Sequence, residues 1–191
     1  VVFPMVSVGA TENALMAAVL AKGSSELVNA AREPEIVDLA NFLNACGAKI
    51  EGAGTDTLLV QGVSSLAPAA EAYSILPDRI EAATYLIAGA ITGGDLTITE
   101  ANPEDLVPVI AKLREAGCVI DIEDRSIRIR RDGPIRSVNI DTEPHPGFPT
   151  DVQAQFMALM TLGDGCSEIR ENIFENRFMH VPELGRMGAN I

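Results

Sequence analysis

The sequence predicts an α/β fold, of the α+β kind, that is built from a repeated helix-strand-helix-hairpin unit. The first observation is a glycine that ends an apolar helical run and recurs at one constant interval, at Gly23, Gly94 and Gly165. The second is a glycine that follows a second helical run, at Gly47, Gly117 and Gly188. Repeats of this length indicate one supersecondary unit used several times, with neighbouring copies burying each other's apolar faces.

The first half of each unit is predicted to be a helix followed by a strand. In the first copy the apolar side chains recur at helical spacing, at Ala14, Leu15, Ala18 and Val19. Gly23 follows where a C′ glycine would satisfy the last carbonyls. The segments after the repeated glycines, residues 26–28, 95–99 and 167–170, alternate polar with apolar side chains. This alternation is typical of a half-buried strand.

The second half of the unit is predicted to be another helix and a strand hairpin. Pro34 lies near the first turn of this helix in copy one, and Asn102-Pro103 combines an N-cap residue with a first-turn proline in copy two. The hairpin is clearest in residues 119–122 and 126–130, which alternate around a polar turn. The third copy stops before its hairpin, and residues 1–6 lead into a helix as residues 137–140 do. We therefore expect the chain to be a piece of a longer protein.

The composition limits the function classes. A formal net charge of −13, from 14 basic and 27 acidic residues, argues against nucleic acid and anionic membrane surfaces as partners. The longest apolar runs are far shorter than the roughly 18 residues of a membrane span, and we expect a cytoplasmic protein. The three cysteines, Cys46, Cys118 and Cys166, show neither a CxxC pair nor a histidine at ligand spacing. No metal and no organic cofactor is therefore expected.

Asp151 is the first candidate for chemistry. Three prolines and a glycine lie in residues 144–150, ahead of an expected helix, and they fix the backbone so that Asp151 points into the space at the N-terminus of that helix. Thr150-Asp151-Val152-Gln153 also has the form of a capping box. An ordinary helix cap is therefore the alternative to a catalytic carboxylate.

The matching helix starts of the other copies are candidates for ligand binding. In copy one, Ser7-Val8-Gly9 would offer backbone N–H groups to an anion, although Ser7 is equally a plain N-cap. Asp78-Arg79 fills the same place in copy two, where a salt-linked helix start is the alternative.

Three arginines recur at expected helix starts in this acidic chain, namely Arg32, Arg79 and Arg177. This recurrence favours anion recognition, because the guanidinium group binds phosphate and carboxylate in a fixed fork. The segments from Arg32 to Glu35 and from Phe174 to His180 are expected to open the second helices of copies one and three. A solvated surface charge is the alternative for each arginine.

Five segments together resemble the UDP-N-acetylglucosamine 1-carboxyvinyltransferase family, the enolpyruvyl transferases of bacterial peptidoglycan synthesis. They are SVGATEN (7–13), NAAREPEIVD (29–38), LPDRIE (76–81), FPTDVQAQ (148–155) and FENRFMHVPEL (174–184). The resemblance covers the whole chain in order. It implies repeated α/β units in two inside-out barrels with a ligand cleft between them. On this basis residues 1–75 are the last unit of one barrel and residues 76–191 the first two units of the other.

The resemblance implies that Asp151 contacts the sugar 3-hydroxyl and takes its proton as that oxygen attacks C2 of phosphoenolpyruvate. It implies that the backbone of residues 6–8 holds the uridine diphosphate part, and that residues 173 and 174 form a wall near the uridine and the sugar. The full set of implied substrate-binding positions is Met5, Val6, Ser7, Val8, Gly9, Arg32, Glu33, Asp78, Arg79, Thr150, Ile173, Phe174 and Arg177. Met5 stands where members of the family carry a basic residue.

The implied activity is transfer of the enolpyruvyl group of phosphoenolpyruvate to the 3-hydroxyl of UDP-N-acetylglucosamine, with release of phosphate. Both compounds would be substrates, and the remaining segments of a parent protein would be partners. The family's cysteine-bearing loop and its Lys-Asn pair near the amino terminus have no match in this sequence. One alternative is the enolpyruvyl transferase of the shikimate pathway, which has the same fold. The other is a non-catalytic nucleotide-sugar-binding or structural module.

Overall fold

The computed structural model describes all 191 residues and divides the chain into two units, Val1–Leu76 and Pro77–Ile191. Each unit has its own apolar core. In the first unit the core includes Leu15, Ile36 and Leu58, and in the second it includes Leu86 and Phe156. All five side chains are inaccessible to solvent.

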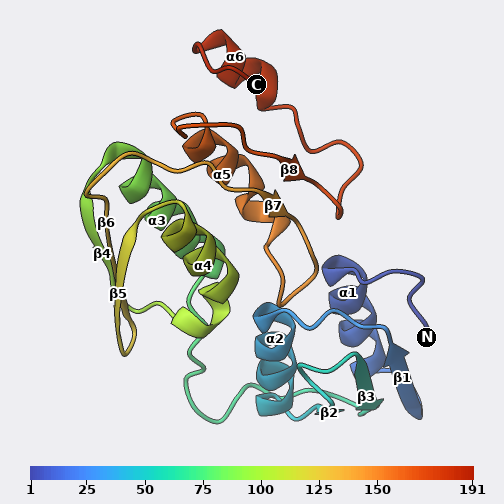
Figure 1. The fold of residues 1–191 in the computed structure, drawn as a ribbon. Coiled ribbons are helices and arrows are strands. Elements are labelled where there is room, and N and C mark those ends of the chain that lie inside the picture. Colours follow the sequence, from blue (N-terminus) through green and yellow to red (C-terminus); the bar gives the residue numbers. More distant parts are fainter. The chain divides into compact units, whose positions relative to one another are not determined.

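Unit one packs two helices against a three-stranded antiparallel sheet with the strand order β1-β3-β2 (Figure 1). Its elements are α1 (Val8–Val19), β1 (Ser24–Val28), α2 (Pro34–Ala45), β2 (Lys49–Glu51) and β3 (Thr57–Gln61). The periodic apolar residues of α1 and the alternating residues of β1 and β3 supply the core, as the sequence pattern predicts.

The first half of unit two repeats this arrangement, with the strand order β4-β6-β5. Its elements are α3 (Arg79–Thr92), β4 (Asp95–Ile98), the 3-10 turn η1 (Pro103–Leu106), α4 (Val107–Glu115), β5 (Val119–Glu123) and β6 (Ser126–Arg130). The same strand order in both sheets confirms the predicted α/β repeat. Neither three-stranded sheet closes into a barrel.

The second half of unit two begins a third copy. Its elements are β7 (Ile140–Asp141), the 3-10 turn η2 (Thr150–Val152), α5 (Gln153–Met160), β8 (Ile169–Arg170) and α6 (Val181–Arg186). Strands β7 and β8 pair in parallel, with Ile140 opposite Ile169. A parallel bridge between Val2 and Val28 repeats this pairing at the start of unit one. The predicted likeness between residues 1–6 and residues 137–140 therefore has a structural counterpart, although only one bridge forms in unit one.

Two predicted helix ends are wrong in detail. Helix α1 ends at Val19 with Leu20 as its C-cap, so Gly23 lies beyond the cap. In copy two the left-handed C-cap residue is Gly93, with φ of 66°, and not the repeated Gly94. The Gly94 N–H donates to the Gly89 carbonyl at 3.0 Å. The glycines that recur at the constant interval therefore mark the turn after the helix, and the αL position can fall one residue earlier.

The second helices begin as predicted in copy one but differently in the others. Pro34 is the first residue of α2. Asn102 caps the turn η1 by accepting from the Glu104 N–H at 3.4 Å, and α4 starts only at Val107. In copy three the helix α6 starts at Val181, so residues 174–180 are not helical. None of the helices is both long and apolar enough to cross a membrane. The assignment of the two units to different barrels stays a prediction.

Candidate functional site

The loop before α5 places Asp151 at the surface. The Gly147 N–H donates to the Pro144 carbonyl at 2.8 Å and closes a turn. Phe148 is buried and packs edge-on against Phe156 of α5, with ring centroids 5.4 Å apart. This ring contact anchors the loop to the helix. The Asp151 side chain is 51% exposed and therefore accessible to a ligand.

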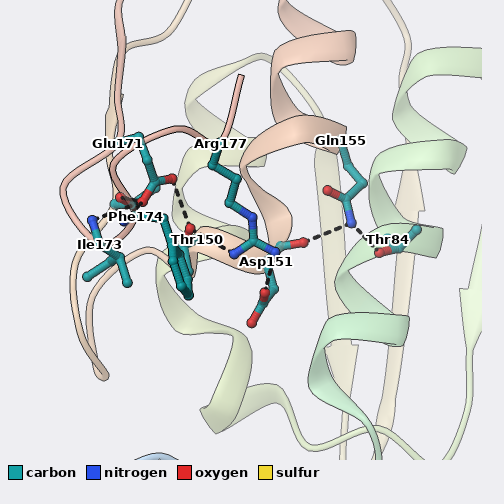
Figure 2. A network of polar contacts seen from close by, with 9 residues as sticks. Thr84, Thr150, Asp151, Gln155, Glu171, Ile173, Phe174 and Arg177 are labelled. Atoms are coloured by element: carbon teal, nitrogen blue, oxygen red, sulfur yellow. Dashed lines mark hydrogen bonds and ion pairs between the residues drawn. The ribbon is translucent and has the colours of Figure 1, made fainter. Parts of the chain in front are cut away.

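Asp151 is paired with Arg177, a residue 26 positions further along the chain (Figure 2). Arg177 Nη2 lies 2.6 Å from Asp151 Oδ1, and Arg177 Nη1 donates to Thr150 Oγ1 at 3.0 Å. One planar guanidinium group therefore binds two neighbouring residues of η2 at once. A fork of this kind holds its two partners in a fixed relative orientation.

The prediction that Arg177 opens a helix is wrong. Arg177 lies in the non-helical segment before α6, and its guanidinium reaches the start of the other helix of the same copy, through η2. The capping-box alternative for Thr150 is also wrong. The hydroxyl of Thr150 bonds to Arg177 and to Glu171, the turn η2 has no side-chain cap, and α5 begins at Gln153.

Glu171, which is not among the site residues predicted from the sequence, is also a member of this network. Its Oε2 accepts from the Thr150 hydroxyl at 2.8 Å, and its Oε1 accepts from the Thr142 hydroxyl at 2.9 Å. The same Oε1 accepts from the N–H groups of Ile173 at 2.9 Å and Phe174 at 3.1 Å. Glu171 therefore joins the end of β7, the start of η2 and the turn after β8.

The repeat spacing could have found Glu171. It stands one repeat interval after Glu100 and two intervals after Asn29. The Asn29 side chain also bonds back across its unit, donating to the Phe3 carbonyl at 3.0 Å. A polar side chain that links this repeat position to the preceding segment is thus common to copies one and three.

The pKa of Glu171 reflects these bonds. Partial burial raises the pKa, but the hydrogen bonds from the Ile173 N–H, Thr150, the Phe174 N–H and Thr142 outweigh it. The pKa therefore lies below the usual value, because donors to a carboxylate favour its ionised form.

Two apolar side chains predicted to form a wall lie in the same place. Ile173 is half-buried, whereas Phe174 is 56% exposed. The guanidinium carbon of Arg177 lies 5.1 Å from the centroid of the Phe174 ring. This is a cation–π contact, and Figure 2 shows the Phe174 ring beside the ion pair of Asp151 and Arg177. The structure thus brings together Thr150, Asp151, Ile173, Phe174 and Arg177.

Gln155 ties this region to the neighbouring helix. Its Nε2 donates to the Asp151 carbonyl at 3.0 Å and to Thr84 Oγ1 of α3 at 3.0 Å (Figure 2). The backbone that carries Asp151 is therefore held from α5 and α3 together. Rigid support of this kind is what a precisely oriented functional group requires.

The predicted residues of unit one form a second group. Ser7 caps α1, its hydroxyl accepting from the Ala10 N–H at 3.3 Å. The buried Thr11 hydroxyl donates to the Ser7 carbonyl at 2.8 Å and accepts from the Ala31 N–H at 3.0 Å. This link places the start of α1 beside the segment that precedes α2.

The other predicted positions of unit one flank this link. Arg32 is exposed and Glu33 is buried, and both follow directly on the bonded Ala31. Met5 and Gly9 are exposed, while Val6 and Val8 are half-buried. The first turn of α1 is thus accessible, and its N–H groups point along the helix axis, as at any helix start.

Asp78 and Arg79 lie at the start of α3. Asp78 is the N-cap, and its Oδ1 accepts from the N–H groups of Ile80 at 2.8 Å and Glu81 at 3.0 Å. Arg79 is buried, with 9% of its surface exposed. Asp78 is therefore the N-cap of α3, a role that differs from the salt-linked helix start given as the alternative.

These observations define a class of protein first. The chain is an α/β repeat protein with an accessible carboxylate-guanidinium pair at the start of a helix, next to an exposed aromatic ring. Comparison with known proteins agrees and goes further. The family described as EPSP synthase (3-phosphoshikimate 1-carboxyvinyltransferase) matches residues 1–191, so the chain belongs to this family.

Curated relatives carry a different name. The UDP-N-acetylglucosamine 1-carboxyvinyltransferase of Magnetococcus marinus is 58% identical over 192 residues, covering 100% of this chain. That of Gluconobacter oxydans is 56% identical over 191 residues, again covering 100% of this chain. The chain spans 45% of the length of each of these relatives. The resemblance predicted from the five segments is confirmed.

Solved structures show the same fold. The enolpyruvyl transferase NikO from Streptomyces tendae superposes with a TM-score of 0.81 at 28% identity, covering 93% of this chain and 42% of that one. EPSP synthase from Acinetobacter baumannii superposes with a TM-score of 0.58 at 19% identity, covering 88% of this chain and 40% of that one. At that identity the second likeness concerns the fold alone.

Proposed function

We propose that the full-length protein containing this chain transfers the enolpyruvyl group of phosphoenolpyruvate to the 3-hydroxyl of UDP-N-acetylglucosamine, with release of phosphate. The observation that carries the proposal is the exposed Asp151 carboxylate, held by Arg177 beside the Phe174 ring. This network occurs in a chain that is 56% to 58% identical to enzymes named for that reaction.

Asp151 is the proposed base. Its carboxylate takes the proton of the sugar 3-hydroxyl while the oxygen attacks C2 of phosphoenolpyruvate; the new C–O bond forms, the π bond between C2 and C3 breaks, and C3 takes up a proton. Removal of a proton from C3 and departure of the phosphate from C2 then restore the carbon–carbon double bond, and the proton that Asp151 took up is released with the phosphate. No electrons are gained or lost, so this chemistry requires no redox cofactor.

Arg177 and Thr150 are proposed to orient the base. The guanidinium holds Asp151 Oδ1 at 2.6 Å, so Asp151 Oδ2 is the oxygen that would meet the substrate hydroxyl. A general base must lie within hydrogen-bond reach of the proton that it takes. Phe174 and Ile173 are proposed to contact the sugar and the uridine through their apolar surfaces.

The residues of unit one are proposed to bind the uridine diphosphate part. Residues 6–8 lead into the first turn of α1, where backbone N–H groups and the positive end of the helix dipole favour a phosphate. Met5, Gly9, Arg32 and Glu33 are proposed to line this part of the site. Asp78 and Arg79 are proposed as further ligand contacts.

The proposed reaction belongs to peptidoglycan synthesis and is therefore tied to cell-wall growth and cell division. Phosphoenolpyruvate and the nucleotide sugar are metabolites of the cytoplasm, and we place the protein there.

A substrate-swap assay tests the proposal. Phosphate release by the full-length protein is measured with phosphoenolpyruvate and either UDP-N-acetylglucosamine or shikimate 3-phosphate. We expect release only with the nucleotide sugar. Release only with shikimate 3-phosphate would move the protein to the other specificity, and release with neither would favour a non-catalytic module.

A further inference from the structure

Glu171 accepts four hydrogen bonds inside the protein. Its two oxygens receive four donors, two hydroxyls and two backbone N–H groups, all between 2.8 and 3.1 Å. An ionised carboxylate offers about four acceptor sites. Three of the donors meet Oε1 and one meets Oε2, so most of the acceptor capacity of Glu171 is used inside the protein, by groups through which it can act on the site.

One of these groups is the hydroxyl of Thr150. Its single proton is donated to Glu171, so the Thr150 oxygen presents a lone pair to Arg177 Nη1 at 3.0 Å. The orientation of this hydroxyl thus determines where the guanidinium fork sits. Through the second arm of the fork it also determines where Asp151 points.

Glu171 also holds the turn that follows β8. Two successive N–H groups, of Ile173 and Phe174, point at one oxygen of Glu171. This closes the turn and directs the Phe174 ring toward Arg177. The buried Thr142 completes the anchor, donating to Glu171 and accepting from the Asn172 N–H at 2.8 Å.

The preceding copy of the repeat offers a comparison for Glu171 within the same chain. Glu100 occupies the same repeat position in the preceding copy, one repeat interval earlier. Its side chain is 82% exposed and pairs with Arg125 at 3.3 Å. The convergent set of donors is therefore particular to the copy that carries Asp151.

We propose that Glu171 is the positioning residue of the nucleotide-sugar site, fixing the Thr150–Arg177–Asp151 chain and the Ile173–Phe174 turn together. The inference rests on the proposed function. It assigns to Glu171 no contact with substrate.

The test variant is Glu171→Gln in the full-length protein. The amide has nearly the same shape but replaces one acceptor oxygen with an NH₂ donor, so either the Thr150 bond or the bonds to the turn must be lost. Glu100→Gln is the matched control, because it makes the same change at the equivalent exposed position.

Steady-state kinetics give the first readout. For Glu171→Gln we expect kcat/KM for the nucleotide sugar to fall about 10- to 100-fold, as misplacement of a supported group typically does. The KM for phosphoenolpyruvate and the activity of Glu100→Gln should stay within about twofold of wild type. A rise in the KM for phosphoenolpyruvate as large as that for the nucleotide sugar, or no loss of kcat/KM, would overturn the positioning role.

Variants of Thr150 test whether Glu171 acts on Asp151 through the Thr150 hydroxyl and Arg177. Thr150→Val removes the hydroxyl and should lose activity, whereas Thr150→Ser keeps the hydroxyl and should lose less than Thr150→Val. Combined with Glu171→Gln, Thr150→Val should add little further loss, because both changes break the same chain. Fully additive losses would contradict a path through Thr150.

Hydrogen exchange separates this inference from the proposed function. In Glu171→Ala, which removes both acceptor oxygens, the amides of Ile173 and Phe174 should exchange faster than in wild type, whatever the enzyme's substrate. Unchanged exchange would overturn the inference. If the wild-type protein turned over neither substrate pair, the proposed function would fail and the nucleotide-sugar role of Glu171 with it.

Discussion

Arg177 shows how a single side chain can organise the site. Its two terminal nitrogens bind Thr150 and Asp151, and its flat face covers the Phe174 ring. The side chain is 38% exposed, so these contacts operate partly in solvent. An exposed ion pair contributes little to stability. We therefore expect Arg177 to matter for orientation more than for folding.

The variant Arg177→Lys tests this expectation. Lysine keeps the positive charge but cannot bind two partners through a planar fork. We expect the unfolding free energy to change by less than about 0.5 kcal/mol, while kcat/KM falls about 10- to 100-fold. The control is Arg186→Lys, which alters an exposed arginine paired with Glu183 on α6 and should leave both quantities unchanged. Full activity of Arg177→Lys would show that charge alone suffices.

Glu171 predicts a specific pH dependence. Its pKa in the folded state is lowered, so its contribution to stability is present above the unfolded value near 4.5 and declines as the pH falls through the folded pKa. Urea unfolding of wild type and Glu171→Gln should thus differ most near neutral pH and converge at lower pH. A difference that stayed constant from about pH 7 to about pH 3 would contradict the assignment.

The start of α3 raises a question at the scale of the element, because Asp78 is both a helix cap and a proposed ligand contact. Replacing a capping aspartate with alanine costs about 1 kcal/mol, whereas serine still caps. We expect Asp78→Ala to lower the unfolding free energy by about that amount and Asp78→Ser to leave it nearly unchanged. If Asp78 also contacts the substrate, Asp78→Ser should lose activity at full stability. Full activity of Asp78→Ser would leave it as a cap alone.

The elements that sequence alone could predict are those with a local signature. The periodic apolar residues of α1, the alternating hairpin β5–β6 and the proline at the start of α2 were sufficient for those elements. The segment 174–180 was predicted to be helical and is not. Arg177 of this segment binds Thr150 and Asp151 of η2, and a tertiary contact of this kind is not visible in the local sequence.

In the candidate site, too, only the features with a local sequence signature could be predicted. Asp151 could be selected from its prolines and from the resemblance, but its pairing with Arg177 spans 26 residues and follows from tertiary structure. For Thr150 the local sequence pattern predicted a role that the structure does not show. Its local capping-box pattern was outweighed by two partners from distant segments, Glu171 and Arg177.

The whole chain consists of two units joined through an irregular segment, residues 64–76. This segment is attached to α2 within unit one. The Tyr73 hydroxyl donates to Asp38 Oδ1 at 2.9 Å, and its ring packs edge-on against Phe42. Most of its residues are exposed, so it is the natural place for a protease to cut.

Limited proteolysis tests this organisation. A protease of broad specificity should cut first within residues 64–76 and release two fragments. Tyr73→Phe removes the hydroxyl bond, worth about 1 kcal/mol, and should speed this cut about fivefold. Tyr85→Phe, on the exposed face of α3, is the control and should not change the rate. First cuts inside either unit would contradict the division.

We propose that the Asp151 carboxylate performs the proton transfer in enolpyruvyl transfer to a nucleotide sugar. The most direct measurement is phosphate release by full-length Asp151→Asn with phosphoenolpyruvate and UDP-N-acetylglucosamine, beside Asp132→Asn, an exposed control carboxylate 3.9 Å from Arg130. Loss of a general base typically costs about 10²- to 10⁴-fold in rate. We predict such a loss for Asp151→Asn with an unchanged fold, and none for Asp132→Asn. Turnover of Asp151→Asn close to that of wild type would contradict the claim and return Asp151 to a structural role.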